Sequence, residues 1–216
     1  MQRARSDNAK DQRRQILLMA ALDEFFDKGF NAARMEDIAA RATLSKGTLY
    51  LYFDSKQALF KALIEDVAIP VVSDTLAQAA NYHSAPQALQ NILRSVARAI
   101  HTTPLPKLVK VIIADGRMFP ELVVFYRAQV VDKMLGKLET LLAMGVANGE
   151  WHCDDTVNTA RLIVAPILFS VIWNMVFAVN NANGRSSDAL NIDSLFDLHF
   201  LHINRILSLK PELNHE

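Results

Sequence analysis

The sequence predicts an all-helical protein, with a three-helix segment at the N-terminal end and a larger helical part after it. Apolar residues recur at helical spacing along most of the chain, and no segment alternates apolar and polar residues as a half-buried strand does. Capping residues, prolines and glycines stand where these helices would begin and end. Hydrophobic residues make up 51% of the 216 residues, which is ample for a buried core. We expect about nine helices.

The first helix is expected over about residues 11–28, because Gly29 after it is a good C-terminal stop. Its role is to support the helices that follow. Its inner face is expected to consist of Leu18, Ala21, Leu22 and Phe25.

Residues 34–56 are expected to form two short helices with a tight corner between them, followed by the start of a third. Apolar residues keep helical spacing on one face before the corner and again after it, so the pair can share a small core. Two helices joined in this way form a helix-turn-helix. The residues of this shared core are Met35, Ile38, Ala39, Ala42, Leu44, Thr48 and Leu49.

Two lysines in this segment have an unfavourable position for helix stability. Ser45 is a good N-cap for the second helix, and Asp54 or Ser55 is one for the next. Lys46 and Lys56 then lie in first turns, where the helix dipole disfavours a positive charge. Either lysine alone is explained as a solvated surface residue. Together they favour an anion lying across both helix starts, such as a DNA phosphate backbone.

The residues expected to bind DNA lie at the corner and at the helix starts. Gly47 would let the backbone approach closely, and Tyr50 and Tyr52 offer hydroxyl groups to phosphates. The full expected set is Arg34, Thr43, Ser45, Lys46, Gly47, Thr48, Tyr50, Tyr52 and Lys56.

The run IAARATLSKGTLYLYFDSKQALF, preceded by RRQILLMAALDEFFDKGF, resembles the N-terminal DNA-binding domain of the TetR family of bacterial transcriptional regulators. The resemblance implies a homodimer whose recognition helices enter successive major grooves of a palindromic operator. It also implies a variable C-terminal domain that binds a small molecule. Thr43 stands where the family usually has a turn glycine, so Thr43 either accepts a left-handed backbone or reshapes the corner. Ala33 and Arg34 replace the usual capping Thr or Ser, and Arg34 is expected to add a phosphate contact.

The formal net charge is zero, and its distribution is only slightly uneven. Residues 1–60 hold ten Lys/Arg and eight Asp/Glu, net +2, and residues 61–216 hold thirteen and fifteen, net −2. DNA binding would therefore act through individual placed residues rather than through a broad positive field. We expect a DNA-binding domain at residues 1–60 and a regulatory and dimerisation domain at residues 61–216. The single cysteine, Cys153, excludes an internal disulfide framework and fits a cytoplasmic protein.

Prolines divide the middle of the chain into helices. Pro70 is expected to kink or end the fourth helix, and a kink there is a candidate hinge. Residues 84–87, Ser-Ala-Pro-Gln, offer a cap, a proline and a capping-box glutamine for the next helix. A short helix over about residues 106–114 and a long one over about residues 120–148 follow.

Residues 162–179 are apolar enough, and long enough, for a transmembrane candidate. Pro166, Ser170 and Asn174 interrupt this run, and its flanks lack a basic cluster. We expect instead a buried helix over about residues 155–180 and no membrane contact. The alternative is a membrane-associated helical protein.

A last helix is expected from Asp188 or Asp193 to Leu209, after the loop NNANGRSS. This helix and the apolar helix before it carry apolar residues on more than one face. A single chain buries one side of each, and a second copy would cover the rest. We therefore expect a four-helix dimer interface.

A regulatory ligand is expected among the fifth to eighth helices. The candidate lining is mostly apolar with a few polar groups, which suits a small hydrophobic or aromatic effector. Ordinary core packing is the alternative for each residue. The candidate set is His101, Met118, Phe119, Phe125, Tyr126, Phe169, Trp173 and Met175.

Catalysis has no support in the sequence, because it lacks a Ser/His/Asp elbow, a phosphate-binding glycine loop and a paired-carboxylate site. Residues 152–155, His-Cys-Asp-Asp, are ligand types, but neighbours in sequence point apart. His199 and His202 share a helical face within the expected interface helix. We expect no enzyme activity, no cofactor and no metal.

These observations predict a sequence-specific transcriptional regulator, a repressor that a small hydrophobic ligand releases from a palindromic operator. One alternative keeps the DNA binding without a ligand, as in an architectural or cell-division protein. Activation in place of repression is a further alternative, because it depends on the position of the operator and not on this chain.

Overall fold

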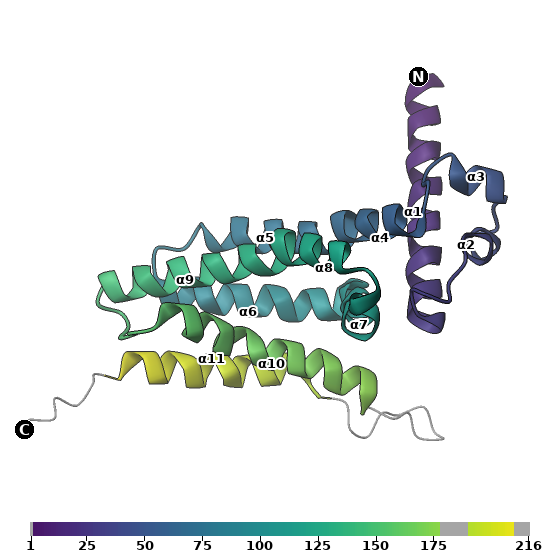
Figure 1. Ribbon diagram of the computed structural model, residues 1–216. Helices are drawn as coiled ribbons and strands as arrows, with labels where there is room; N and C mark the ends of the chain where they lie inside the picture. The colour runs from purple at the N-terminus through teal and green to yellow at the C-terminus, as the bar shows by residue number, and fades with distance from the viewer. Residues whose placement is uncertain (1, 178–189, 210–216) are drawn as a thin grey trace, which may run out of the picture. The chain divides into compact units, whose positions relative to one another are not determined.

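The computed structural model describes the backbone of residues 2–177 and 190–209, and the side chains of residues 9–175, 177 and 190–209. Every regular element in these ranges is a helix, which confirms the all-helical fold class (Figure 1). The expected helix end at Asn180 and the loop NNANGRSS lie outside the described residues.

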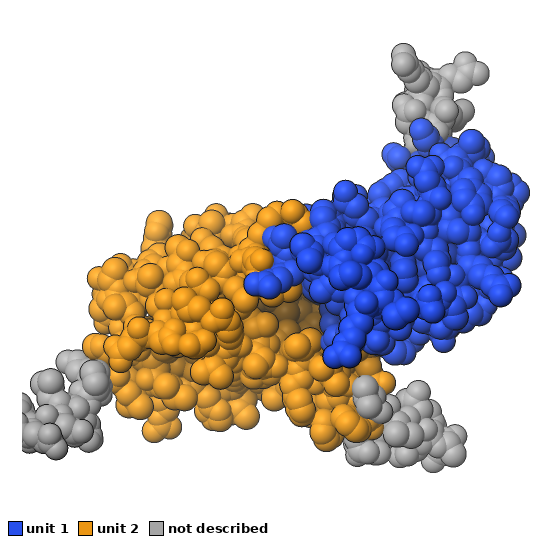
Figure 2. All heavy atoms as spheres, viewed as in Figure 1, with its two compact units in different colours: residues 1–69, 104–128 blue, residues 70–103, 129–216 orange. Residues whose placement is uncertain are grey.

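The chain forms two compact units, which Figure 2 shows in different colours. Unit 1 comprises residues 1–69 and 104–128, and unit 2 comprises residues 70–103 and 129–216. The expected division into a DNA-binding domain at residues 1–60 and a regulatory domain at residues 61–216 stays a prediction.

Unit 1 contains the N-terminal helices and two helices from the middle of the chain. The first N-terminal helix begins at Gln2 rather than near residue 11, because residues 2–10 contain neither glycine nor proline. The elements of unit 1 are α1 (Gln2–Lys28), α2 (Met35–Arg41), α3 (Lys46–Tyr50), α4 (Lys56–Leu63), η1 (Ile64–Ala68), α7 (Leu105–Asp115), η2 (Gly116–Met118) and α8 (Pro120–Tyr126).

Unit 2 contains the remaining helices, two of which begin in unit 1. The π-helical turns η1 and η3 join helices without a break, so the described residues form nine continuous helices, as expected. The elements are α5 (Ile69–Ala79), α6 (Ala85–Thr102), η3 (Arg127–Val131), α9 (Asp132–Ala147), α10 (Thr156–Val176) and α11 (Ile192–Ser208).

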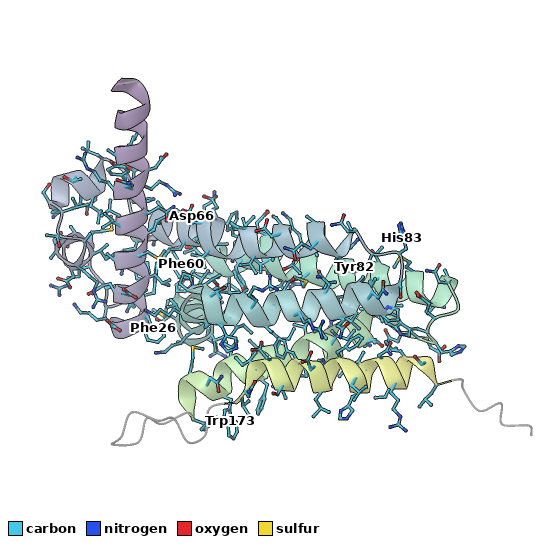
Figure 3. All side chains as sticks on the ribbon, turned by 180° about the vertical axis from the view of Figure 1, so that it is seen from behind. Phe26, Phe60, Asp66, Tyr82, His83 and Trp173 are labelled. Carbon is cyan, nitrogen blue, oxygen red and sulfur yellow. The ribbon has the colours of Figure 1, made fainter. Side chains whose placement is uncertain are left out.

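Four phenylalanines form the centre of unit 1. Phe25 of α1, Phe30 after it, Phe60 of α4 and Phe119 before α8 are all almost completely buried. Their ring centroids lie 4.4 to 5.9 Å apart in tilted and edge-on pairs, the arrangement that aromatic rings prefer. Figure 3 labels Phe60 in this cluster. The cluster joins the N-terminal helices to the segment that carries Phe119.

The backbone of Phe30 is held from both sides by charged groups. Its N–H donates to Oδ2 of Asp115 at 2.7 Å, at the end of α7. Its carbonyl accepts from Nζ of Lys56 at 2.7 Å, and the carbonyl of Asn31 accepts from the same ammonium at 3.0 Å. Gly29 has φ 81°, and a Cβ there would lie 3.0 Å from the Asp115 carboxylate, so only glycine fits this close approach.

The corner between α2 and α3 is closed by a Schellman motif with a threonine at its left-handed position. The Leu44 N–H donates to the carbonyl of Ala39 at 2.9 Å, and the Thr43 N–H donates to that of Ala40 at 3.0 Å. Thr43 has φ 56°, so of the two expected outcomes the chain takes the left-handed backbone. A branched side chain in this region is strained.

Pro70 lies inside a helix and does not end it. The interpretation of Pro70 as a plain helix end is therefore wrong, whereas its role as a hinge stays a prediction. The π-helical turn η1 directly precedes it, and the Ile69 N–H donates to the carbonyl of Ile64, five residues back. This wider turn makes room for the proline ring, which would clash in a regular helix. It also aims Asp66 (Figure 3) at Arg14, whose Nη1 donates to both carboxylate oxygens at 2.8 Å.

Unit 2 is built on a ring of four helices, in which α6 packs against α9 and α11, and α10 packs against the same two. Trp151 is 1% exposed in its core, and its Nε1 donates to Asn204 of α11 at 2.9 Å. The expected cap at Ser84 forms no side-chain cap bond. Instead the Ala85 N–H donates to the carboxylate of Glu150 at 2.9 Å, which lowers the pKa of Glu150.

Helix α10 is long and apolar enough to cross a membrane, the one such helix that the search of the described residues finds. The expectation that it is buried is wrong for the single chain, because only 22% of its apolar stretch is buried. Ile163 and Ser170 face inward, whereas Leu162 and Phe169 are 65% and 53% exposed. The helix needs a further apolar surface to cover it.

Replacing Asp115 by Ala should lower the free energy of unfolding by about 1–3 kcal/mol, because it leaves the part-buried Phe30 N–H without its acceptor. Urea denaturation measures the change. Glu65→Ala is the control, since Glu65 is exposed on η1 and should change stability by less than about 0.5 kcal/mol. Equal stability of both variants would contradict this role of Asp115.

Replacing Thr43 by Gly should raise the free energy of unfolding by about 0.5–1 kcal/mol. Glycine adopts the left-handed backbone without strain, and the strain that is removed exceeds the extra conformational entropy that glycine loses on folding. The melting temperature should rise by about 2–4 °C. Thr43→Ala keeps a Cβ in the strained position and should recover little of this gain. A lower melting temperature for Thr43→Gly than for wild type would show that the corner is not strained.

Candidate nucleic-acid interface

Helices α2 and α3 lie on the same side of α1 and share a small core (Figure 1). Met35, Ile38 and Ala39 of α2 and Leu49 of α3 are buried, as the helical spacing predicted. The chain therefore contains a helix-turn-helix, with α3 as the exposed second helix.

The start of α3 has the cap that the sequence predicts. The Ser45 side chain accepts from the Thr48 N–H at 3.1 Å and lies 2.8 Å from the Thr48 hydroxyl. Ser55 caps α4 in the same way, accepting from the Ala58 N–H at 3.1 Å. Arg34 is the first residue before α2 and makes no side-chain cap bond, as its type predicts.

Helix α3 and the corner before it present a largely exposed surface. Tyr50 is 41% exposed, and Thr43, Ser45, Lys46 and Gly47 are exposed as well. A Cβ at Gly47 would meet only the Ser45 hydroxyl, at 3.8 Å, so packing within the protein does not require glycine there. The backbone of another molecule can therefore approach the start of α3 closely.

Lys46 is paired with a carboxylate of the neighbouring helix. Its Nζ lies 2.5 Å from Oε1 of Glu36 on α2, and 5.8 Å from the centre of the Tyr50 ring. This hydrogen bond lowers the pKa of Glu36 and raises that of Lys46. The expected site set did not include Glu36, because residues ten apart in sequence meet only through the corner.

Lys56 lies in the first turn of α4, but its ammonium points at the protein. It donates to the carbonyls of Phe30 and Asn31 and lies 5.0 Å from the centre of the Phe30 ring. Burial lowers its pKa. The unfavourable position of this lysine at a helix start thus has an internal explanation, and its expected phosphate contact stays a prediction. Thr48 and Tyr52, also in the expected set, are half-buried.

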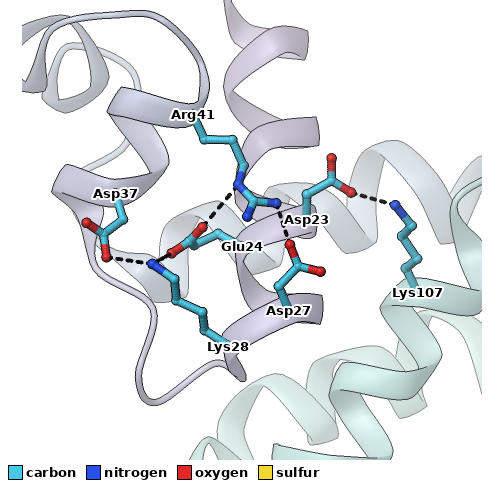
Figure 4. A network of polar contacts seen from close by, with 7 residues as sticks. All are labelled: Asp23, Glu24, Asp27, Lys28, Asp37, Arg41 and Lys107. Carbon is cyan, nitrogen blue, oxygen red and sulfur yellow. Dashed lines mark hydrogen bonds and ion pairs between the residues drawn. The ribbon is translucent and has the colours of Figure 1, made fainter.

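A network of ion pairs fixes α2 against α1 (Figure 4). Glu24 is 2% exposed and forms ion pairs, with its Oε1 2.5 Å from Nζ of Lys28 and its Oε2 3.1 Å from Nε of Arg41. Arg41 also contacts Asp27 at 2.8 Å, and Lys28 contacts Asp37 at 3.1 Å. Removing one partner of a buried ion pair is strongly destabilising, because it leaves a buried charge unpaired. The network therefore holds α2 rigidly against α1, and α2 supports α3. Only the Glu24–Lys28 pair, four residues apart on one helix, could have been read from the sequence.

The residues expected to bind a ligand are divided between the two units. In unit 1, Phe119 belongs to the phenylalanine cluster, and Met118 beside it is 63% exposed. The Phe125 ring lies 5.0 Å from Nζ of Lys61. Burial raises the pKa of Tyr126 to about 12. Core packing accounts for Phe119, whereas a ligand contact of the others stays a prediction.

In unit 2, Trp173 of α10, which Figure 3 labels, contacts Phe169 and Phe177, whose tilted rings have centroids 5.6 and 5.1 Å from its own. His101 lines a groove of about 500 Å³ between α6 and α11. Of the eight expected ligand residues only His101 lies there, and two arginines and two aspartates are among the lining residues. The lining consists of Arg94, Ala97, Arg98, His101, Thr102, Asp193, Phe196 and Asp197.

The two residue clusters considered for a metal are occupied in other ways. The Nε2 of His199 lies 3.0 Å from the carbonyl of Ile163, so it carries the proton and donates. Asp155 caps α10 by accepting from the Asn158 N–H at 2.9 Å. A search of the described residues finds no group of three or more His, Cys, Asp or Glu that could hold a metal ion.

Two family models match the chain. The model of bacterial regulatory proteins of the tetR family matches residues 17–63, which include α2 and α3. The model of the AefR-like transcriptional repressor C-terminal domain matches residues 87–200, more than half of the 216-residue chain.

Individual relatives agree with these matches. The chain is 46% identical to the HTH-type transcriptional activator FasR of Mycolicibacterium smegmatis over 56 residues, 26% of each chain. It is 27% identical to YdeS of Bacillus subtilis, an uncharacterized HTH-type transcriptional regulator, over 157 residues, 72% of this chain and 76% of YdeS. The match to FasR thus spans about a quarter of that protein.

Solved structures share the fold. The ketosteroid transcriptional regulator KstR2 of Mycobacterium tuberculosis superimposes with a TM-score of 0.72 at 18% identity, over 92% of this chain and 96% of that one. Because it contains a helix-turn-helix and both family models match, the chain belongs to the TetR family, and it is a DNA-binding transcriptional regulator rather than an enzyme.

Proposed function

We propose that the protein acts as a homodimeric repressor, which a small hydrophobic ligand releases from a palindromic operator. The observation that carries the proposal is the exposed apolar surface of α10 and α11. Both helices expose several large apolar side chains away from the unit 2 core. On α10 they are Leu162, Leu168 and Phe169, and on α11 they are Leu198, Leu201 and Ile206, all at least 44% exposed.

A second copy of the chain is the partner that suits this surface. Each large apolar side chain that becomes fully buried contributes about 1.5–3 kcal/mol, so six on each chain supply a strong driving force. Two copies of α10 and α11 would form a four-helix interface around a two-fold axis. The same contact would keep α10 in the cytoplasm rather than in a membrane.

A two-fold symmetric dimer carries two copies of α3 and therefore favours a DNA site with two-fold symmetry. The residues that we propose to contact it are those exposed at the corner and along α3. Lys46 would contact a phosphate, Gly47 would allow close backbone approach, and Tyr50 would donate its hydroxyl. Arg34, exposed at the start of α2, would add a further phosphate contact.

The ligand and the direction of regulation rest on the relatives. The C-terminal match is to a repressor, and the name of KstR2 refers to ketosteroids, which are hydrophobic molecules. FasR is named an activator, but its match covers only 26% of this chain and 26% of FasR. A ligand would act by favouring one separation of the two α3 helices, and a few kcal/mol of differential affinity are enough for release.

Replacing Phe169 or Leu201 by Glu should convert the dimer to a monomer, because a charge cannot be buried in an apolar interface without a partner. Sedimentation velocity measures the oligomeric state. Val124→Glu, on the equally exposed surface of α8, is the control and should stay dimeric. A dimer in all three variants would contradict this interface.

Purified protein should bind DNA from its own upstream region more tightly than random DNA, at two salt concentrations. Lys46→Ala should weaken binding to both DNAs by similar factors, as the loss of a phosphate contact does.

A panel of apolar compounds should contain some that raise the melting temperature and lower operator affinity. Operator binding that no compound in the panel weakens would support the alternative without a ligand.

A further inference from the structure

The ion pair between Glu36 and Lys46 lies at the end of α3 that faces DNA in a helix-turn-helix. Lys46 is the one basic residue of α3, which runs KGTLY. Its ammonium lies 2.5 Å from Oε1 of Glu36, and the two side chains are 57% and 53% exposed. Both partners are thus within reach of a macromolecule that approaches the start of α3.

We propose that Glu36 limits the affinity of the protein for DNA, by competing with the phosphate backbone for the Lys46 ammonium. The inference rests on the proposed contact of Lys46 with a DNA phosphate. In the free protein the carboxylate already satisfies this cation. A phosphate that contacts Lys46 must displace Glu36 or lie beside it, and both outcomes carry a cost.

The cost is electrostatic. If Glu36 is displaced, its charge remains within a few ångströms of a phosphate and repels it. If Glu36 stays, the ammonium is shared by two anions. The other charges near Glu36 do not remove this competition between carboxylate and phosphate. Asp37 is paired with Lys28 at 3.1 Å, and Arg34 only favours the charged form of the Glu36 carboxylate.

The competition has a signature in the salt dependence. A lysine that neutralises a phosphate releases condensed counterions, with a slope of about −0.9 in log K against log salt for each contact. A lysine that leaves a carboxylate for a phosphate exposes a negative charge that binds a cation in exchange. Wild-type protein should therefore gain little salt dependence from Lys46.

The test is a double-mutant cycle of Glu36→Gln and Lys46→Met, with a random-sequence duplex of about 30 base pairs as the probe. No operator has to be known, since phosphate contacts are made on any sequence. Affinity is measured by fluorescence anisotropy at several salt concentrations. Circular dichroism melting of each variant checks that it is folded.

Glu36→Gln should bind about threefold more tightly for each α3, hence about tenfold for a dimer, which is the scale of an exposed ion pair. Its salt slope should steepen by about one for each α3. Both effects should be clearly smaller in the Lys46→Met background, where no ammonium is left to compete for and only the repulsion between Glu36 and phosphate remains. The control is Asp54→Asn, which removes one exposed charge next to α3 for which the described residues provide no ion-pair partner.

The outcomes separate the inference from the proposed contact. Tight binding by Glu36→Gln in both lysine backgrounds, equal to the gain of Asp54→Asn, would mean a general charge effect and overturn the inference. Wild-type affinity for Glu36→Gln together with weak binding by Lys46→Met would overturn it while keeping the phosphate contact. Wild-type affinity for Lys46→Met would overturn the contact and the inference together.

Discussion

The position of Phe30 is the constraint on which unit 1 depends. Its ring completes the buried phenylalanine cluster, while Asp115 and Lys56 hold its N–H and its carbonyl from opposite sides. Apolar contact alone is not directional, and hydrogen bonds alone would leave a loop exposed to water. Together they fix the connection between α1 and α2 at a single position. The helix-turn-helix is thereby attached to α4 and α7 as well as to α1.

Charges in unit 1 have two different roles, which burial separates. Glu24 is almost completely buried, and its pairing with Lys28 and Arg41 is structural because an unpaired buried carboxylate would be costly. The pair of Glu36 and Lys46 is exposed, where salt screens it and another anion can replace Glu36. The first network holds the helices, and we propose that the second exchanges with a DNA phosphate.

Unit 2 places its polar groups where they fix the ends of helices and leaves an apolar surface outside. Glu150 satisfies the start of α6, and Asn174 of α10 accepts from the Leu190 N–H before α11 at 2.8 Å. Trp151 fills the centre, close to Gly145, where a Cβ would come within 2.3 Å of the Trp151 ring. With the inner faces of the helices satisfied in this way, the exposed apolar residues of α10 and α11 form the surface that we propose for dimerisation.

The sequence by itself determined the helices, the cap at Ser45, the helix-turn-helix and its family, because these depend on residues within a few positions of each other. It left Asp54 and Ser55 as two candidate caps for α4. The left-handed corner at Thr43 was one of two options that local chemistry left open. Only the tertiary structure decided the roles of Lys56, Glu36 and Asp115, since their partners come from other helices. It also decided that α10 is apolar without being buried, because exposure depends on what packs against a helix and not on its own composition.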